Sequence, residues 1–254
     1  MFKRKSIIII ALFIALILPA VTFSAWCDPL PIPKIGLDIE AADNPKDVAM
    51  SVQIMFMLTI LSLAPSLLIM LTSFTRIIIV LSFTRNALGT QQMPPNQVLI
   101  GLALFLTFFI MSPVITEINE TAFKPYTNGV ITQEVAIEKA VQPVRTFMFK
   151  YTREKDLALF LKLGQVNQPL AKSDIPTSTL IPAFIISELK TAFEIGFFLY
   201  IPFLMIDMVV ASTLMSMGMM MLPPIMISMP FKILLFVMVD GWNLIVKSLI
   251  MGFK

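Results

Sequence analysis

Residues 181–217 read IPAFIISELKTAFEIGFFLYIPFLMIDMVVASTLMSM, and this stretch decides the class of fold. It is predominantly apolar and carries four charged side chains, those of Glu188, Lys190, Glu194 and Asp207. As one straight helix it would reach roughly 54 Å, well beyond the about 30 Å hydrocarbon core of a bilayer. The stretch therefore predicts a membrane helix that either projects out of the membrane or bends back on itself.

Three further apolar stretches lie at residues 48–83, 98–115 and 225–251. The whole chain is 57% apolar and 14% charged, with a mean hydropathy of +0.86. Soluble domains usually run near 45–50% apolar and about 25% charged. The sequence therefore predicts an all-α integral membrane protein with four long hydrophobic helices or helical hairpins, some of them broken.

The composition excludes several classes of function. The chain has no His and one Cys, Cys27, which removes Ser-His-Asp and Cys-His catalysis, Cys/His zinc sites and any intrachain disulfide. The net charge of +3 is accounted for by Lys3, Arg4 and Lys5, so no basic face remains for nucleic acid. We predict no catalytic residue, cofactor or metal, and the role of Cys27 stays unassigned.

The first segment has the pattern of a secretory signal. Three basic residues precede an apolar run from Ile7 to Leu18, and Pro19 and several small residues follow. The alternative is an uncleaved membrane helix, but twelve residues span only about 18 Å. We expect residues 1–25 to be removed and residues 26–47 to form an extracytoplasmic segment.

A polar insert covers residues 117–179 and holds eight basic and seven acidic residues. Apolar residues recur within it at intervals of three and four, which predicts one apolar stripe on a helix that Pro143 should kink. The stripe comprises Ile137, Ala140, Val141, Val144, Phe147, Met148 and Tyr151, and a second short helix carries Leu157, Phe160 and Leu161. The insert is either a small helical domain with its own core or a surface for a neighbouring subunit. Because so short a segment buries little core alone, we expect the stripe to pack on something outside the insert.

The charges also predict an orientation. Once the signal is removed, the mature N-terminus lies outside the cytoplasm. The turn after the first stretch carries Arg76 and Arg85 and no acid, which places it inside. The insert and the C-terminus then lie outside, and the Met-rich turn described below lies inside.

Charges within the apolar stretches are expensive at the bilayer centre, at about 2.5–3.5 kcal/mol each on insertion scales. Lys190 and Glu194 are four residues apart, so they share a helix face and can pair. Glu188 points elsewhere and needs a partner on another helix or another chain, as do Asp207, Lys232 and Asp240. These charges serve as pairs within one chain, as contacts between subunits, or as a path for protons or ions.

Residues 215–229 read MSMGMMMLPPIMISM, with seven Met around Gly218 and the Pro223-Pro224 pair. Gly and Pro break a helix, so these flexible apolar side chains lie at a bend. One interpretation is a greasy turn packed against lipid or neighbours. The other is a turn buried in protein or lining a cavity, because non-helical backbone cannot face lipid with its polar groups unsatisfied. A ring of such turns would form a deformable apolar plug.

Two long motifs resemble the FliP/SctR family of type III secretion export-gate proteins. Residues 182–193, PAFIISELKTAF, continue as EIGF and resemble the first signature of the flagellar FliP members. Residues 230–242, PFKILLFVMVDGW, resemble the second signature, and residues 214–224, LMSMGMMMLPP, lie between the two as in that family. The resemblance covers residues 48–254. The signal segment favours the flagellar branch, since the virulence homologues usually lack one.

This resemblance implies a subunit of the flagellar export gate in the bacterial inner membrane. About five copies would assemble with FliQ-like and FliR-like proteins in the basal body, largely on the extracytoplasmic side. Unfolded flagellar proteins would pass along the axis. The resemblance makes Met219, Met220 and Met221 the gasket of the pore, Glu188 and Lys232 contacts between subunits, and Phe147 and Phe160 packing anchors.

Other interpretations remain open at this point. A virulence-type secretion homologue shares the motifs. A secondary transporter or ion-channel subunit would use Glu188, Glu194 and Asp207 as a coupling path, although no inverted repeat is visible. A membrane enzyme would need a nucleophile or a metal cluster, and the sequence offers neither.

Overall fold

The computed structural model describes residues 45–90, 92–165, 171–219 and 222–253, with 45–51 described by their backbone. The helices are α2 (Pro45–Met70), α3 (Phe74–Leu88), α4 (Asn96–Ile118), the π-helix η2 (Asn119–Phe123), α5 (Lys124–Thr127), α6 (Gln133–Tyr151), α7 (Glu154–Leu163), the 3-10 turn η3 (Lys172–Asp174), α8 (Thr177–Ser216), α9 (Pro224–Met238) and α10 (Gly241–Met251). No strand occurs among these residues, which confirms the all-α prediction. The predicted signal at residues 1–25 and Cys27 lie outside them.

The first apolar stretch forms two helices, which agrees with the prediction of long hydrophobic elements that are partly broken. At the end of α2, two threonine hydroxyls form hydrogen bonds with backbone carbonyl oxygens of the last turn. Thr72 Oγ1 donates to Leu68 O at 2.8 Å, and Thr75 Oγ1 donates to Ile69 O at 3.1 Å. Such local bonds compete with helix continuation, and α3 starts afresh at Phe74. The contacts divide the chain inside α2, between Met55 and Phe56, and the helices from Phe56 onward form the body described below.

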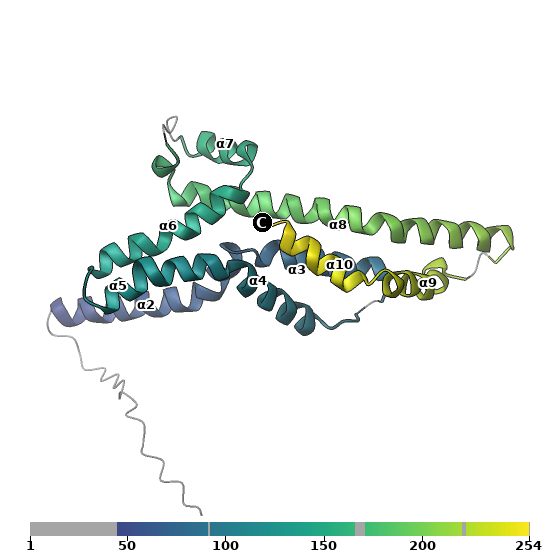
Figure 1. Ribbon diagram of the computed structural model, residues 1–254, viewed down its shortest axis with the longest axis horizontal. Coiled ribbons are helices and arrows are strands. Elements are labelled where there is room, and N and C mark those ends of the chain that lie inside the picture. Colours follow the sequence, from purple (N-terminus) through teal and green to yellow (C-terminus); the bar gives the residue numbers. More distant parts are fainter. Residues whose placement is uncertain (1–44, 91, 166–170, 220–221, 254) are drawn as a thin grey trace, which may run out of the picture. The chain divides into compact units, whose positions relative to one another are not determined.

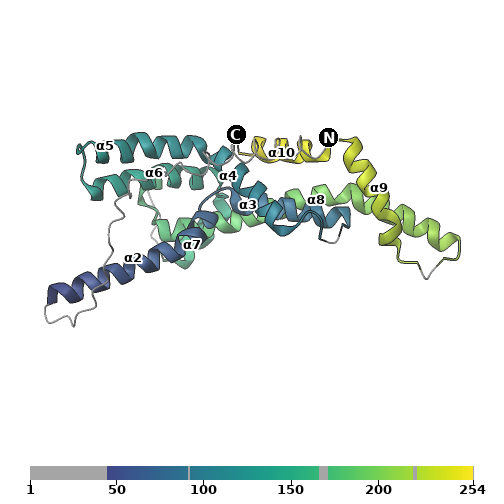
Figure 2. The ribbon, with the colours of Figure 1, turned by 90° about the horizontal axis from the view of Figure 1, so that it is seen from below.

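The centre of this body is the packing of α3 on α8. Ile77, Val80, Leu81 and Thr84 repeat at helical spacing on α3 and are buried to 0% exposure. They meet a matching stripe on the first half of α8, formed by Leu180, Phe184, Ser187, Glu188, Ala192 and Gly196. Figures 1 and 2 both show α3 beside this part of α8. Gly196 permits the approach, because a Cβ there would lie 2.7 Å from Cγ of Phe83.

The polar insert is a helical hairpin that packs against α4 and α8. The chain continues from α4 through η2 and α5, reverses, and returns as α6 alongside α4 (Figure 1). Pro143 lies inside α6, which runs as one helix on both sides of this residue. The end of the stripe packs outside the insert, since the rings of Phe147 and Phe184 on α8 are 6.0 Å apart. The start of the stripe stays exposed, with Ile137 58% accessible.

The fourth apolar stretch is bent rather than straight. Helices α9 and α10 meet at 63°, at a break where Asp240 adopts a left-handed φ of 51°. Gly241 is the residue this bend requires, because a Cβ there would lie 2.3 Å from the ring of Phe236. The two half-length helices together still have the length and apolarity of one span.

Within the part of the chain that the structure describes, three helical segments are long and apolar enough to cross a membrane, and the bent pair counts as a fourth if it is one span. The three are Val52–Met70, Asn96–Thr127 and Thr177–Ser216. None of the first window is buried inside the described chain, which means that lipid or other chains must cover its side chains. Helix α8 has 40 residues and a length of about 60 Å, about twice a bilayer core.

Candidate functional site

The first half of α8 carries a buried ion pair that joins distant parts of the chain. Arg76 of α3 donates from Nε to Glu188 Oε2 at 2.9 Å and from Nη2 to Glu188 Oε1. The Arg76 side chain is 5% exposed and that of Glu188 is fully buried. A bidentate guanidinium–carboxylate pair fixes both position and orientation, so it sets the register of α3 on α8.

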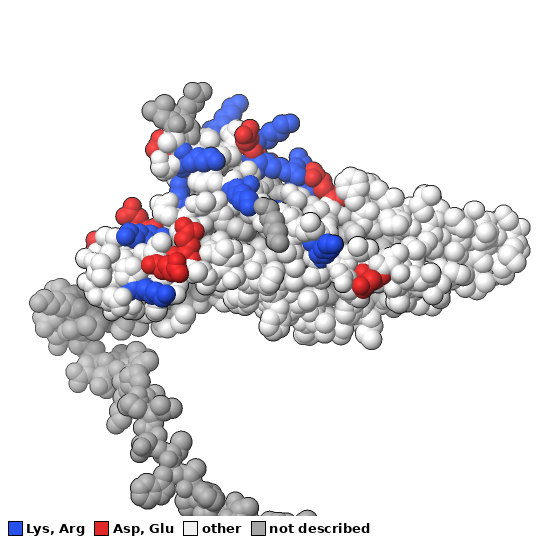
Figure 3. Space-filling model, in the orientation of Figure 1, with Lys and Arg blue, Asp and Glu red and all other residues white. Residues whose placement is uncertain are grey.

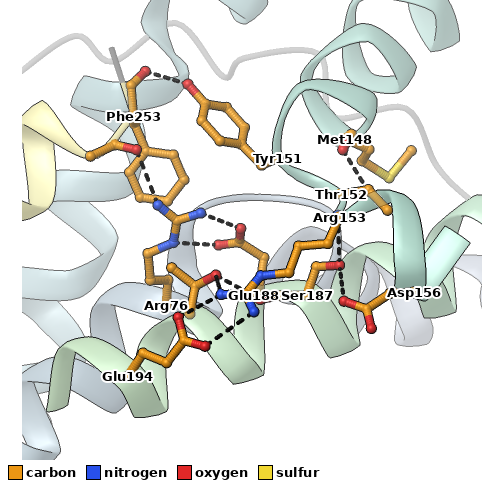
Figure 4. A network of polar contacts seen from close by, with 12 residues as sticks. Arg76, Met148, Tyr151, Thr152, Arg153, Asp156, Ser187, Glu188, Glu194 and Phe253 are labelled. Atoms are coloured by element: carbon orange, nitrogen blue, oxygen red, sulfur yellow. Dashed lines mark hydrogen bonds and ion pairs between the residues drawn. The ribbon is translucent and has the colours of Figure 1, made fainter. Parts of the chain in front are cut away.

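The same guanidinium holds the C-terminal residues. Nη1 of Arg76 donates to Gly252 O at 3.2 Å, and its Cζ lies 3.9 Å from the centre of the Phe253 ring. The hydroxyl of Tyr151, at the end of α6, donates to the carbonyl oxygen of Phe253. Figure 4 shows Arg76 between Glu188 and Phe253, with Tyr151 on the far side of that ring. Arg76 thus connects α3, α6, α8 and the end of α10 at one point.

A second set of polar contacts attaches the insert to α8 (Figure 4). The backbone N–H of Arg153 donates to Ser187 Oγ at 3.0 Å, and that hydroxyl donates to Asp156 Oδ2 at 2.7 Å. The Arg153 guanidinium binds both oxygens of Glu194, at 3.1 and 2.6 Å. The hydrogen bond to Glu194 raises the pKa of Arg153 above its ordinary value, so this cation stays charged. Residues of the first signature therefore hold the turn between α6 and α7.

The second signature contributes an ion pair further along α8. Lys232 of α9 donates from Nζ to Asp207 Oδ2 at 2.6 Å, and Ser228 Oγ donates to Asp207 Oδ1 at 2.5 Å. The Lys232 side chain is 3% exposed and that of Asp207 26%. The pair fixes α9 against the second half of α8.

The helix α8 ends in a Schellman motif at the Met-rich bend. Gly218 has φ 75° and donates its N–H to Met215 O, while Met219 donates to Leu214 O, both at 3.1 Å. Met215 and Met217 are 63% and 71% exposed, and Met219 is half-buried. Met220 and Met221 lie outside the described residues. Helix α9 then begins at Pro224, whose missing N–H costs nothing at a helix start.

An apolar groove lies between α8 and α9 just before this bend. It has a volume of about 580 Å³ and is lined by Met205, Ile206, Val209, Val210, Thr213, Leu214, Ile227 and Phe231. Figure 3 shows charged side chains gathered over α5, α6 and α7, whereas the end of α8 and α9 carry none on that face. The residues that line the groove thus include no charged side chain.

The structure corrects three pairings expected from the sequence. Glu188 does not need a neighbouring subunit, because Arg76 of the same chain takes both of its oxygens. Glu194 forms its ion pair with Arg153 rather than with Lys190, since the α6–α7 turn brings a guanidinium to that face. Lys232 likewise pairs within the chain, with Asp207. Of the remaining predicted residues, Asp240 is exposed at the bend before α10, Lys190 is exposed on α8, and Phe160 is half-buried on α7.

The partners that complete these sites do not follow from the sequence, and they are Arg76, Arg153, Tyr151 and Phe253. Arg76 carried a signal, as a cation inside an apolar stretch, but it was assigned to a turn. Among the described residues, no group of three or more His, Cys, Asp or Glu could hold a metal ion. The ion pairs hold packed helices together. The groove beside the bend is lined mainly by apolar side chains.

Comparison with known proteins agrees with these features. Residues 57–249 match the FliP family. The chain is similar to the flagellar biosynthetic protein FliP of Bacillus subtilis (strain 168), with 59% identity over 85% of this chain and 98% of that protein. The protein of the same name from Pectobacterium carotovorum is 56% identical over 80% of this chain and 79% of its own length. That of Treponema pallidum is 50% identical over 87% and 83% respectively.

Proposed function

The chain belongs to the FliP family, and from this premise we propose that it is a subunit of the flagellar type III protein export gate. Its relatives are named flagellar biosynthetic proteins, which makes it a component of the flagellar export apparatus. In the proposed role it forms, with FliQ and FliR, the channel through which unfolded flagellar proteins cross the bacterial inner membrane. It acts as a conduit and carries out no catalysis.

The Met-rich bend is the observation that supports a conduit. Flexible thioether side chains stand exposed at Met215 and Met217, and the helices that lead into the bend bear no charge there beyond the Asp207–Lys232 pair. If several copies bring Met219, Met220 and Met221 to a common axis, they form a dry neck that water and ions avoid. Met side chains can move aside for a polypeptide and close again.

The proposed assembly has about five copies of this chain together with FliQ and FliR. Its support is the apolar surface that the single chain leaves uncovered, above all on α2, where the window Val52–Met70 has no buried residue. Subunits packed side by side would cover such helices. Because buried pairs such as Arg76–Glu188 form within one copy, we expect contacts between copies to be made by the exposed apolar faces.

The alternatives receive less support. Glu188, Glu194 and Asp207 each form an ion pair within the chain. These pairs hold helices together, and they do not form a row of unpaired carboxylates along which protons or ions could move. The relatives compared above are flagellar by name, which favours the flagellar over the virulence-type system.

The conductance of the assembled complex tests the proposal. We expect Met219→Ala, Met220→Ala and Met221→Ala together to widen the neck and cause an ion leak, while export of flagellar proteins persists. A matched control replaces three exposed methionines away from the bend and from α2, Met93, Met208 and Met238, with Ala. The control should assemble and remain ion-tight. An assembled complex that carries the bend triple and stays as tight as the wild type would overturn the gasket assignment.

A further inference from the structure

Lys247 on α10 is a charge without an evident partner. Ion pairs take up Arg76, Glu188, Glu194, Asp207 and Lys232 of the long apolar segments, whereas Lys190 and Asp240 are exposed. Lys247 is exposed, and no described residue forms an ion pair or hydrogen bond with its ammonium group. It belongs to the bent pair α9–α10, which is apolar enough to enter a membrane. A cation there is costly unless it reaches the headgroup level or meets an anion.

Lys247 lines a groove of about 770 Å³ between α4 and α10. Leu102 of α4 forms one wall, and the α10 wall consists of Trp242, Asn243, Val246, Lys247, Ile250 and Met251. These α10 residues recur at intervals of three and four, which places them on one helix face. The volume falls in the about 300–1,000 Å³ range of ligand sites. The groove thus combines long apolar walls with a single cation.

The chemistry of the lining selects the ligand. Apolar walls fit a hydrocarbon chain, while the Lys247 ammonium and the Asn243 amide fit an anionic oxygen. Trp242 and Lys247 are five residues apart, about 7.5 Å along a helix, so both can lie at headgroup depth, where Trp is enriched. A Lys near the end of a membrane helix extends its ammonium group to the interface, where lipid phosphates lie. A soluble anion would leave the walls unexplained, and an apolar peptide would leave the cation unexplained.

We propose that the groove between α4 and α10 binds one anionic phospholipid, with an acyl chain along Leu102, Val246 and Ile250 and the phosphate at Lys247. The site is separate from the Met-rich bend and would tie the bent pair α9–α10 to the anionic lipid of the membrane. Its occupancy therefore depends on lipid headgroup charge and not on cargo.

Trp242 is a built-in probe for this site, because the chain has one other Trp, Trp26. In a Trp26→Phe background, the full chain is reconstituted in phosphatidylcholine vesicles that contain a small fraction of lipid with brominated acyl chains. We expect brominated phosphatidylglycerol to quench Trp242 fluorescence at least about threefold more than brominated phosphatidylcholine at the same mole fraction. Lys247→Gln should remove that preference, because the phosphate loses its cation.

Two further variants keep the test decisive. Lys247→Arg retains the charge and should retain the preference, whereas Lys162→Gln, at an exposed Lys on α7, should leave it unchanged. The helical circular dichroism of each variant shows whether it is folded. Equal quenching by the two lipids in the parent protein overturns the proposal, and so does a preference that survives Lys247→Gln. Absence of quenching by either lipid would mean that protein covers the groove, which also overturns it.

Discussion

At the scale of the residue, Arg76 and Glu188 illustrate how one pair can organise a membrane protein. Both side chains are buried, and each compensates a charge that the other would leave isolated in an apolar core. Arg rather than Lys suits this position, because its planar group binds the carboxylate, the Gly252 carbonyl and the Phe253 ring at once.

We predict that Glu188→Ala and Arg76→Ala each lower the free energy of unfolding by about 3–5 kcal/mol, because each leaves an uncompensated buried charge. The double variant should lose clearly less than the sum of the two, since no lone charge remains. Reversible unfolding in mixed detergent micelles measures all three. Glu194→Ala, which breaks the more exposed pair with Arg153, is the control and should change the midpoint little. Additive losses at positions 76 and 188 would show that the two side chains act independently.

At the scale of the element, glycines mark where helices approach most closely. Gly196 of α8 faces Phe83 of α3, and a Cβ there would come within 2.7 Å of the ring. Gly101 of α4 is also helical, but no atom lies within 4 Å of the place where its Cβ would be. The two positions separate the effect of packing from the effect of helix propensity.

We predict opposite outcomes for the two Ala substitutions. Gly196→Ala should destabilise the protein by about 1–3 kcal/mol, because α3 must move away from α8. Gly101→Ala should stabilise it by up to about 1 kcal/mol, because Ala restricts the unfolded backbone. Thermal unfolding in detergent, followed by circular dichroism, gives both changes. Destabilisation by Gly101→Ala, or tolerance of Gly196→Ala, would mean that the α3–α8 contact is not limited by volume.

The sequence predicts the helical elements better than their ends. Apolar runs and helical spacing suffice for α8, α4 and the stripe on α6. The break between α2 and α3 depends on hydroxyl bonds from Thr72 and Thr75, which an apolar run does not reveal. Pro143 removes one backbone hydrogen bond from α6, and the helix nevertheless runs from Gln133 to Tyr151 through this residue.

For the candidate site, the sequence likewise predicts which residues need partners but not which partners they find. The position of Glu188, Asp207 and Lys232 within apolar stretches predicts that they need partners, because unpaired charge is costly there. The identity of those partners depends on tertiary packing: Arg76 lies 112 positions before Glu188, and Asp207 lies 25 before Lys232. Local spacing suggested Lys190 for Glu194, but the turn after α6 supplies Arg153 instead.

At the scale of the whole molecule, orientation in the membrane links the elements to function. Arg76 lies in α3 and is buried with Glu188, so it does not contribute a positive charge to a loop. Arg85 remains as the basic residue before the α3–α4 turn, where its Nη1 donates to Asn96 Oδ1 at 2.5 Å. That turn carries no acid, so from the positive-inside rule we still expect it to lie in the cytoplasm.

The segment from Asn96 to Thr127 has 32 residues and is about 48 Å long, which is enough to put its two ends on opposite sides of a bilayer core. We therefore predict opposite accessibility for two exposed positions, Gln92 before this segment and Asn128 after it. In a Cys27→Ser background, a membrane-impermeant maleimide added to spheroplasts should label Asn128→Cys and leave Gln92→Cys unlabelled until the membrane is disrupted. Labelling of both cysteines in intact spheroplasts would mean that α4 does not separate two compartments. The reverse labelling pattern would mean that the insert lies in the cytoplasm. The Met-rich bend would then lie on the extracytoplasmic side, opposite to the orientation predicted from the sequence.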